Sequence, residues 1–184
     1  MKASSIDLLR HGKTVAGSAY IGSSDVALVD LGWQQMRDSV DQALSDNQQW
    51  DVILSSPLIR CADFAHKLAD ELAIPLVIEA QLAEYHFGDW EQMTALEVME
   101  KYPGKLERFW EDPLANTPSQ GENLAEFSKR IDCAILNVHR QYSDLRVLII
   151  CHGGVMRYLL SAQQQLPISA MLTFSVEHGQ LIRY

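Results

Sequence analysis

The sequence has few cysteines, fewer basic than acidic residues and no long apolar run, and each shortage excludes a class of protein. Its three cysteines, Cys61, Cys133 and Cys151, are too few and too scattered for a disulfide framework or a C-x-x-C zinc site. Fifteen Lys and Arg against 24 Asp and Glu give a formal net charge of −9. Such a surface repels nucleic acid and anionic membranes, so we expect neither as a partner.

The apolar stretches are too short for a membrane helix, which requires about 20 consecutive residues. Asp7 and Arg10 interrupt the apolar region that an N-terminal secretion signal would need. Together with the absence of a disulfide pattern, these features predict a cytoplasmic protein. The content of 47% hydrophobic and 21% charged residues is typical of globular chains, and no linker or repeat divides the sequence. We therefore expect a single domain over residues 1–184.

Short apolar runs alternate with amphipathic segments along the chain. The apolar runs predict strands over 5–9, 51–54, 76–78, 146–151, 172–176 and 180–184. Apolar residues at helical spacing predict helices over 31–45, 58–72, 95–102, 106–110, 123–142 and 155–164. Strands and helices in this order form a mostly parallel sheet that is covered on both faces. The expected fold class is α/β, a three-layer α/β/α sandwich with a mostly parallel central sheet.

Polar residues follow three of the predicted strands. Because ligands of such sheets bind beyond the carboxyl ends of the strands, we expect these residues to converge on one pocket. Arginine grips phosphate oxygens with two N–H groups, while glycine at a helix N-terminus lets backbone N–H groups approach an anion. The pattern predicts a phosphate site. Its residues are Arg10-His11-Gly12, Ser55-Ser56-Pro57 with Arg60, and His152-Gly153-Gly154.

Five segments then resemble motifs of the histidine phosphatase superfamily, whose fold is phosphoglycerate-mutase-like. They occur in the family's order and extend from residue 8 to about 160, which is far more specific than one short motif. The segments are 9–14 (LRHGKT, like R-H-G-x-[ST]), 55–60 (SSPLIR, like S-S-P-L-x-R), 82–91 (LAEYHFGDWE, like L-x-E-x-x-F-G-x-W-E), 121–123 (GEN, like G-E-S) and 152–157 (HGGVMR, like H-G-G-V-[IM]-R).

The resemblance implies a role for each matching residue. His11 would be the nucleophile that carries the phosphoryl group, and Glu84 the acid that protonates the leaving oxygen and then activates water. Arg10, Arg60 and His152 would bind the phosphoryl oxygens. The two arginines disfavour protonation of His11, which keeps it nucleophilic. The implied substrate is a small-molecule phosphomonoester, with no cofactor or metal required.

The subfamily and the remaining substrate contacts are less specific. Tyr20-Ile21-Gly22, followed by Asp25, is similar to the alpha-ribazole phosphatases of cobalamin nucleotide-loop assembly, which suggests alpha-ribazole 5′-phosphate as substrate. Further substrate contacts are expected from Tyr20, Gly22, Gly153 and Lys13, although Lys13 stands where the family most often has Glu. Gly17 likewise replaces an Asn of many members. A broad-specificity sugar or nucleotide phosphatase and a phosphoglycerate-mutase-type phosphotransferase remain alternatives, and the oligomeric state is open.

Three rival interpretations start from the residues alone. Cys151 and Arg157 fit the C-x5-R pattern of cysteine-dependent phosphatases, but that mechanism leaves His11, Arg60 and Glu84 without a task. A metal site lacks H-x3-H or H-x-H spacing. A phospho-ligand binding module that has lost catalysis would not need Glu84.

Aromatic residues and the remaining histidines also carry expectations. Trp110 is expected to pack in the core or a helix seam, and Trp90 to shape the pocket mouth beside Glu84. His86 and His178 lie on predicted loops that could reach the rim of the site.

Overall fold

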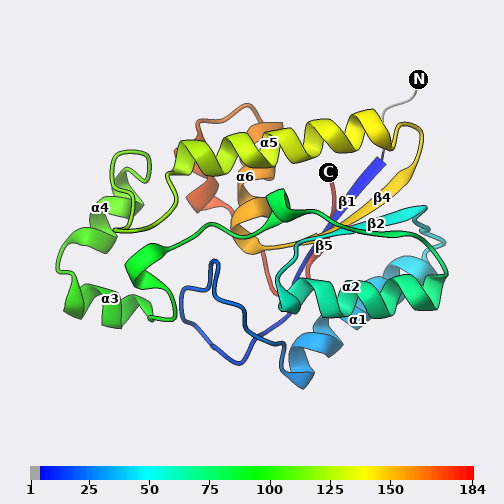
Figure 1. The fold of residues 1–184 in the computed structure, drawn as a ribbon, viewed down its shortest axis with the longest axis horizontal. Helices are drawn as coiled ribbons and strands as arrows, with labels where there is room; N and C mark the ends of the chain where they lie inside the picture. The colour runs from blue at the N-terminus through cyan, green and yellow to red at the C-terminus, as the bar shows by residue number, and fades with distance from the viewer. Residues whose placement is uncertain (1–4) are drawn as a thin grey trace.

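The computed structural model describes residues 5–184, and its strands form one five-stranded sheet in the order β3-β2-β4-β1-β5 (Figure 1). The first four residues, part of the expected N-terminal segment and of the expected domain, lie outside the described residues. Neighbouring strands among β1 to β4 pair in parallel, while β5 pairs antiparallel with β1. The strands are β1 (Ser5–Arg10), β2 (Val52–Ser55), β3 (Leu76–Ile78), β4 (Arg146–Cys151) and β5 (Leu181–Arg183).

Helices cover both faces of the sheet, as Figure 1 shows with α5 (Leu124–Gln141) and α6 (Gly153–Gln163) on one side. On the other side lie α1 (Asp30–Ser45) and α2 (Ile59–Leu72). Successive side chains of a strand point to opposite faces, so the unbroken apolar run of β4 supplies both cores. The structure confirms the predicted three-layer α/β/α sandwich with a mostly parallel sheet.

Two hydrophobic clusters make up these cores. Val147 and Ile149 of β4 pack with residues of α5 and α6, such as Phe127. Leu148 and Ile150 belong to the second cluster, which contains residues of α1 and α2. Within residues 5–184, no helix is long and apolar enough to span a lipid bilayer.

The segment between β3 and α5 extends the molecule beyond the carboxyl end of β1, at the left of Figure 1. It contains α3 (Ala95–Lys101), α4 (Lys105–Glu111) and the short 3₁₀ helices η1 (Ala80–Leu82) and η2 (Gly88–Trp90).

The predictions for the two tryptophans of this segment, Trp90 and Trp110, are wrong. Trp90 does not form a pocket mouth: it is buried and packs edge-to-face on Phe109, with ring centroids 5.5 Å apart. Trp110 is 46% exposed, because it follows Phe109 by one position and one residue turns a helix by about 100°. Leu106 and Phe109 occupy the buried face of α4 instead.

The strand predicted over 172–176 is wrong. Ile168–Thr173 forms the 3₁₀ helix η3, and irregular chain then leads to β5. In a β-strand, the carbonyl groups of Phe174 and Val176 would accept hydrogen bonds from a neighbouring strand. Here the Phe174 carbonyl accepts from Arg157 Nε and the Val176 carbonyl from Arg10 Nη1. Burial of Val176 against the core therefore accounts for the apolar pattern without a strand.

Candidate active site

The ends of β1, β2 and β4 meet at one edge of the sheet, because these three strands are neighbours and run in parallel. Arg10 pairs in register with Cys151, and the backbone N–H of His11 donates to the Cys151 carbonyl at 3.0 Å. This register places the rings of His11 and His152 edge-to-face, with centroids 5.2 Å apart. Two histidines that are distant in the sequence thus share one site.

The imidazole of His11 is held in a defined tautomer. Its Nδ1 lies 2.8 Å from the Gly12 carbonyl oxygen. Since a carbonyl oxygen only accepts, Nδ1 carries the proton and Nε2 keeps its lone pair. Burial, followed by the charge of Arg60, lowers the pKa of His11 well below its ordinary value, although the bond to Gly12 opposes this. His11 is therefore a neutral imidazole with a free nucleophilic nitrogen near neutral pH.

Arg10 presents an unused donor to the same site. Its Nη1 donates to the Val176 carbonyl at 2.6 Å, and its Nη2 lies 3.2 Å from Nε2 of His178. Its Nε is buried and has no hydrogen-bond partner among residues 5–184. A Cβ at position 153 would lie 3.1 Å from that nitrogen, so Gly153 leaves room beside it. An anion is the natural partner for this N–H group.

Arg60 and His152 are fully buried and lie outside the lining of the cavity. Arg60 Nε donates to His152 Nδ1 at 3.2 Å. Burial, and then the charge of Arg60, lowers the pKa of His152 well below its ordinary value. The proton of this neutral ring is therefore on Nε2, which donates to Ser56 Oγ at 2.7 Å.

The carboxylate of Glu84 faces the cavity from the segment after η1. Its Oε1 accepts from the Tyr85 N–H and its Oε2 from the Gly154 N–H, both at 2.9 Å. A Cβ at position 154 would overlap Oε1, so a side chain there would displace the Glu84 carboxylate from this position. The first turn of α6 therefore holds an acidic group in the cavity that His11 also lines.

Arg10, His11 and Glu84 line one cavity of about 230 Å³. Its wall is mostly aromatic and apolar, and a second arginine, Arg157, lies in it. Arg157 comes four residues after Gly153 on α6, so helical periodicity could have identified it as facing the same site. The lining residues include Arg10, His11, Tyr20, Glu84, Phe87, Phe109, Gly153, Gly154, Arg157, Leu172 and His178.

Other residues expected near the substrate occupy different places. Tyr20, Gly17 and Gly153 line the cavity, whereas Lys13 and Gly22 do not. Lys13 is exposed, and the Gly22 N–H donates to the Glu91 carboxylate. Sequence reasoning assigned no role to Glu91.

Two of the remaining histidines occupy different positions relative to the site. His178 lines the cavity, where burial and then the charge of Arg10 lower its pKa to about 4. His86 instead bonds to Ser23 and Glu91.

The structure gives the cysteine-dependent mechanism no suitable geometry. Cys151 is fully buried within the core cluster, and burial raises the pKa of its thiol well above the ordinary value. A thiol in this position cannot reach a substrate in the cavity. Among the described residues 5–184, no three His, Cys, Asp or Glu side chains are grouped so as to hold a metal ion.

A sequence profile described as the histidine phosphatase superfamily (branch 1) matches residues 6–184. The chain belongs to this superfamily. A glucosyl-3-phosphoglycerate phosphatase of Mycolicibacterium vanbaalenii is 33% identical over 177 residues, which cover 91% of this chain and 77% of the relative. An adenosylcobalamin/alpha-ribazole phosphatase of Escherichia coli is 27% identical over 174 residues, which cover 94% and 85%.

Solved structures of the superfamily agree with the fold. The alpha-ribazole phosphatase from Shigella flexneri superimposes with a TM-score of 0.83 at 27% identity, covering 96% of this chain and 88% of that one. A mycobacterial glucosyl-3-phosphoglycerate phosphatase in complex with VO3 gives 0.85 at 25% identity, covering 97% and 90%. The chain is thus a histidine phosphatase superfamily phosphatase, and its similar relatives differ in substrate.

Proposed function

We propose that the protein hydrolyses a small-molecule phosphomonoester through a phosphohistidine on His11, without a metal ion. The observation that carries the proposal is the tautomer of His11, which leaves Nε2 unprotonated in the cavity that Arg10 and Glu84 also line. A neutral imidazole beside fixed positive charge is suited to attack a phosphoryl group.

In the first step, the lone pair of His11 Nε2 forms a bond to phosphorus, and the bond between phosphorus and the ester oxygen breaks. Glu84 donates its proton to that oxygen, so the alcohol leaves neutral. In the second step, a water oxygen attacks phosphorus and the P–N bond breaks. The Glu84 carboxylate takes a proton from the water, which returns both residues to their starting states.

The groups around His11 would stabilise the charge on the transferring phosphoryl oxygens. Arg10 lines the cavity and supplies a positive charge there, and the N-terminus of α6 at Gly153 adds a positive dipole end. In this scheme Arg60 adds positive potential at His11 and is held by its hydrogen bond to His152.

For the substrate, we propose alpha-ribazole 5′-phosphate as the first compound to test. Two relatives with that activity in their names support it. The cavity supports it as well, since Tyr20, Phe87, Phe109 and Leu172 line its wall. Aromatic and apolar side chains of this kind pack favourably against a flat heterocyclic base.

A second candidate is a phosphomonoester that also carries a carboxylate, as a glucosyl-phosphoglycerate does. Arg157 favours it, because this arginine lines the cavity and no carboxylate partner for it is found within residues 5–184. Its Nε donates to the Phe174 carbonyl at 3.0 Å, which leaves its terminal N–H groups for a ligand.

The test is p-nitrophenyl phosphate hydrolysis in EDTA by the wild type, by His11→Ala and by Cys151→Ser, followed by both candidate substrates. We expect turnover by the wild type and Cys151→Ser and none by His11→Ala. Loss of activity in Cys151→Ser would favour the cysteine mechanism. A wild type that hydrolyses none of the three compounds would favour a binding module. A loss of activity in EDTA that added metal restores would overturn metal independence.

A further inference from the structure

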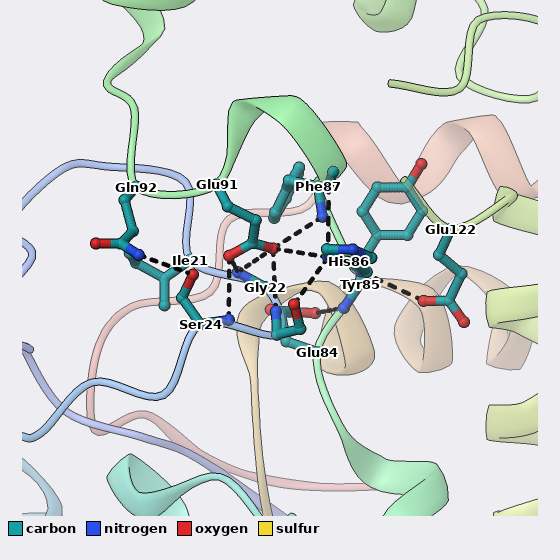
Figure 2. A network of polar contacts seen from close by, with 12 residues as sticks. Ile21, Gly22, Ser24, Glu84, Tyr85, His86, Phe87, Glu91, Gln92 and Glu122 are labelled. Atoms are coloured by element: carbon teal, nitrogen blue, oxygen red, sulfur yellow. Dashed lines mark hydrogen bonds and ion pairs between the residues drawn. The ribbon is translucent and has the colours of Figure 1, made fainter. Parts of the chain in front are cut away.

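The loop of residues 21–24 is attached to the Glu91 carboxylate by three consecutive backbone N–H groups. Figure 2 shows Glu91 over this loop, with dashed lines to Gly22 and Ser24. The Gly22 N–H lies 3.1 Å from both carboxylate oxygens, the Ser23 N–H 3.0 Å from Oε1 and the Ser24 N–H 3.1 Å from Oε2. Successive N–H groups that surround one anion form a stable nest, here filled by a side chain.

Arg60 holds the carbonyl groups of the same loop. Its Nη1 donates to the Ser24 carbonyl and its Nη2 to the Gly22 carbonyl, both at 2.8 Å, with a longer contact of 3.4 Å to Ile21. The loop therefore lies between a carboxylate on its N–H side and a guanidinium on its carbonyl side. Each charge stabilises the peptide orientation that the other requires.

Glu91 also binds the segment that carries Glu84. The Phe87 N–H donates to Glu91 Oε1 at 3.0 Å, and His86 Nδ1 lies 3.2 Å from the same oxygen (Figure 2). Burial raises the pKa of Glu91, but hydrogen bonds from Ser24, Phe87 and His86 outweigh it and lower the pKa below its ordinary value. The carboxylate is therefore ionised, as a strong acceptor must be.

The two segments approach each other so closely that position 22 admits no side chain. A Cβ there would overlap both the Tyr85 carbonyl oxygen and the Glu91 carboxylate. Immediately before the loop, the Tyr20 N–H donates to the Met93 carbonyl, and the Gln92 N–H to the Tyr20 carbonyl, both at 2.8 Å. Tyr20 is part of the cavity wall, so this junction sets the shape of the cavity.

We propose that Glu91 is a positioning residue of the active site, a role that rests on the proposed function. It acts through the 21–24 loop, whose carbonyl groups orient the guanidinium of Arg60 beside His152 and His11. It also ties that loop to the segment after Glu84. Glu91 itself lies outside the cavity lining, so its effect on the phosphoryl site is indirect.

The test compares Glu91→Gln with Glu97→Gln, a control whose carboxylate is exposed and bonds to Thr94 in the capping box of α3. A glutamine side chain offers one accepting oxygen and places an NH₂ group against the loop N–H groups. We expect hydrogen exchange at Gly22, Ser23 and Ser24 to accelerate about tenfold or more. We also expect calorimetry to show inorganic phosphate binding about tenfold more weakly, while Glu97→Gln matches the wild type on both measurements.

Unchanged exchange in the 21–24 loop, or faster exchange with unchanged phosphate affinity, would overturn the proposal. If Glu91→Gln does not fold, Glu91→Asp serves instead, because it keeps the charge but withdraws the oxygens by one methylene. Both measurements should then shift in the same directions by smaller factors, and no shift would count against the role. A wild type that neither binds phosphate nor hydrolyses phosphomonoesters would instead show that the proposed function fails.

Discussion

The backbone N–H of Gly154 donates to Oε2 of Glu84 at 2.9 Å, across 70 residues of sequence. This bond connects the start of α6, which follows β4, to the segment after η1. It fixes the carboxylate on the wall that His11 also lines. The proposed acid and the proposed nucleophile are therefore placed relative to one another by a helix N-terminus rather than by a shared loop.

Replacement of His11 by alanine is expected to reduce kcat for p-nitrophenyl phosphate by about 10⁴-fold or more, because no other group supplies the attacking lone pair. Rapid acid-free quenching and mass spectrometry should detect a phosphoryl group on His11 in the wild type. His66→Gln is the control, since His66 is exposed on α2, and it should retain full activity. A phosphoryl group on another residue would contradict the assignment.

Glu84→Gln is expected to discriminate between leaving groups. An alkyl phosphate needs protonation of its leaving oxygen, so its kcat should fall by roughly 10²- to 10⁴-fold. p-Nitrophenolate leaves readily without a proton, so the rate at which it is released in the first step should fall much less. Single-turnover kinetics on both compounds separate the two steps. Equal losses in that first step would argue against the acid role.

Arg157→Gln addresses the substrate. If a carboxylate of the substrate pairs with Arg157, KM for a glucosyl-phosphoglycerate should rise by about 10- to 100-fold, since a charge-assisted pair contributes roughly 1.5–3 kcal/mol. KM for p-nitrophenyl phosphate should change little. Arg140→Gln, in the last turn of α5, is the matched control. A similar rise in KM for both substrates would show that Arg157 does not select for the second acidic group.

Stability should decrease as the pH falls below about 6.5, where unfolded histidines become protonated. The pKa values of buried His11 and His152 lie well below this in the folded protein, so the unfolded state binds more protons. Each residue then adds at most about 1.4 kcal/mol per pH unit to the slope of the free energy of unfolding. The slope is confined to the pH range between the folded and unfolded pKa values. The corresponding stabilisation is fully present above the unfolded pKa and is lost as the pH falls toward the folded one.

Urea denaturation between about pH 7.5 and pH 5 measures this slope. The slope should be shallower for His11→Asn, which removes one of these groups, and unchanged for the exposed control His66→Gln. The same slope in His11→Asn as in the wild type would show that His11 is not held neutral by the fold.

Much of the architecture follows from local sequence pattern. Unbroken apolar runs such as 146–151 have the length and composition of buried parallel strands. The helical spacing of apolar residues predicted the helices that the structure shows as α5 and α6. The predicted strand over 172–176 failed because an apolar pattern indicates burial, not hydrogen-bond partners. In this segment, Arg157 and Arg10 bind the carbonyl groups of Phe174 and Val176.

The sequence by itself determined which residues stand at the strand ends, because strand length and direction are encoded locally in apolar residues. Which of their polar atoms face the cavity was decided only by the tertiary structure. Arg60 donates hydrogen bonds to loop carbonyl groups 36 to 39 residues away in the sequence and to His152, 92 residues away. The Glu91 carboxylate accepts hydrogen bonds from backbone N–H groups 67 to 69 residues away. Such contacts depend on how distant segments pack, so spacing along the chain does not reveal them.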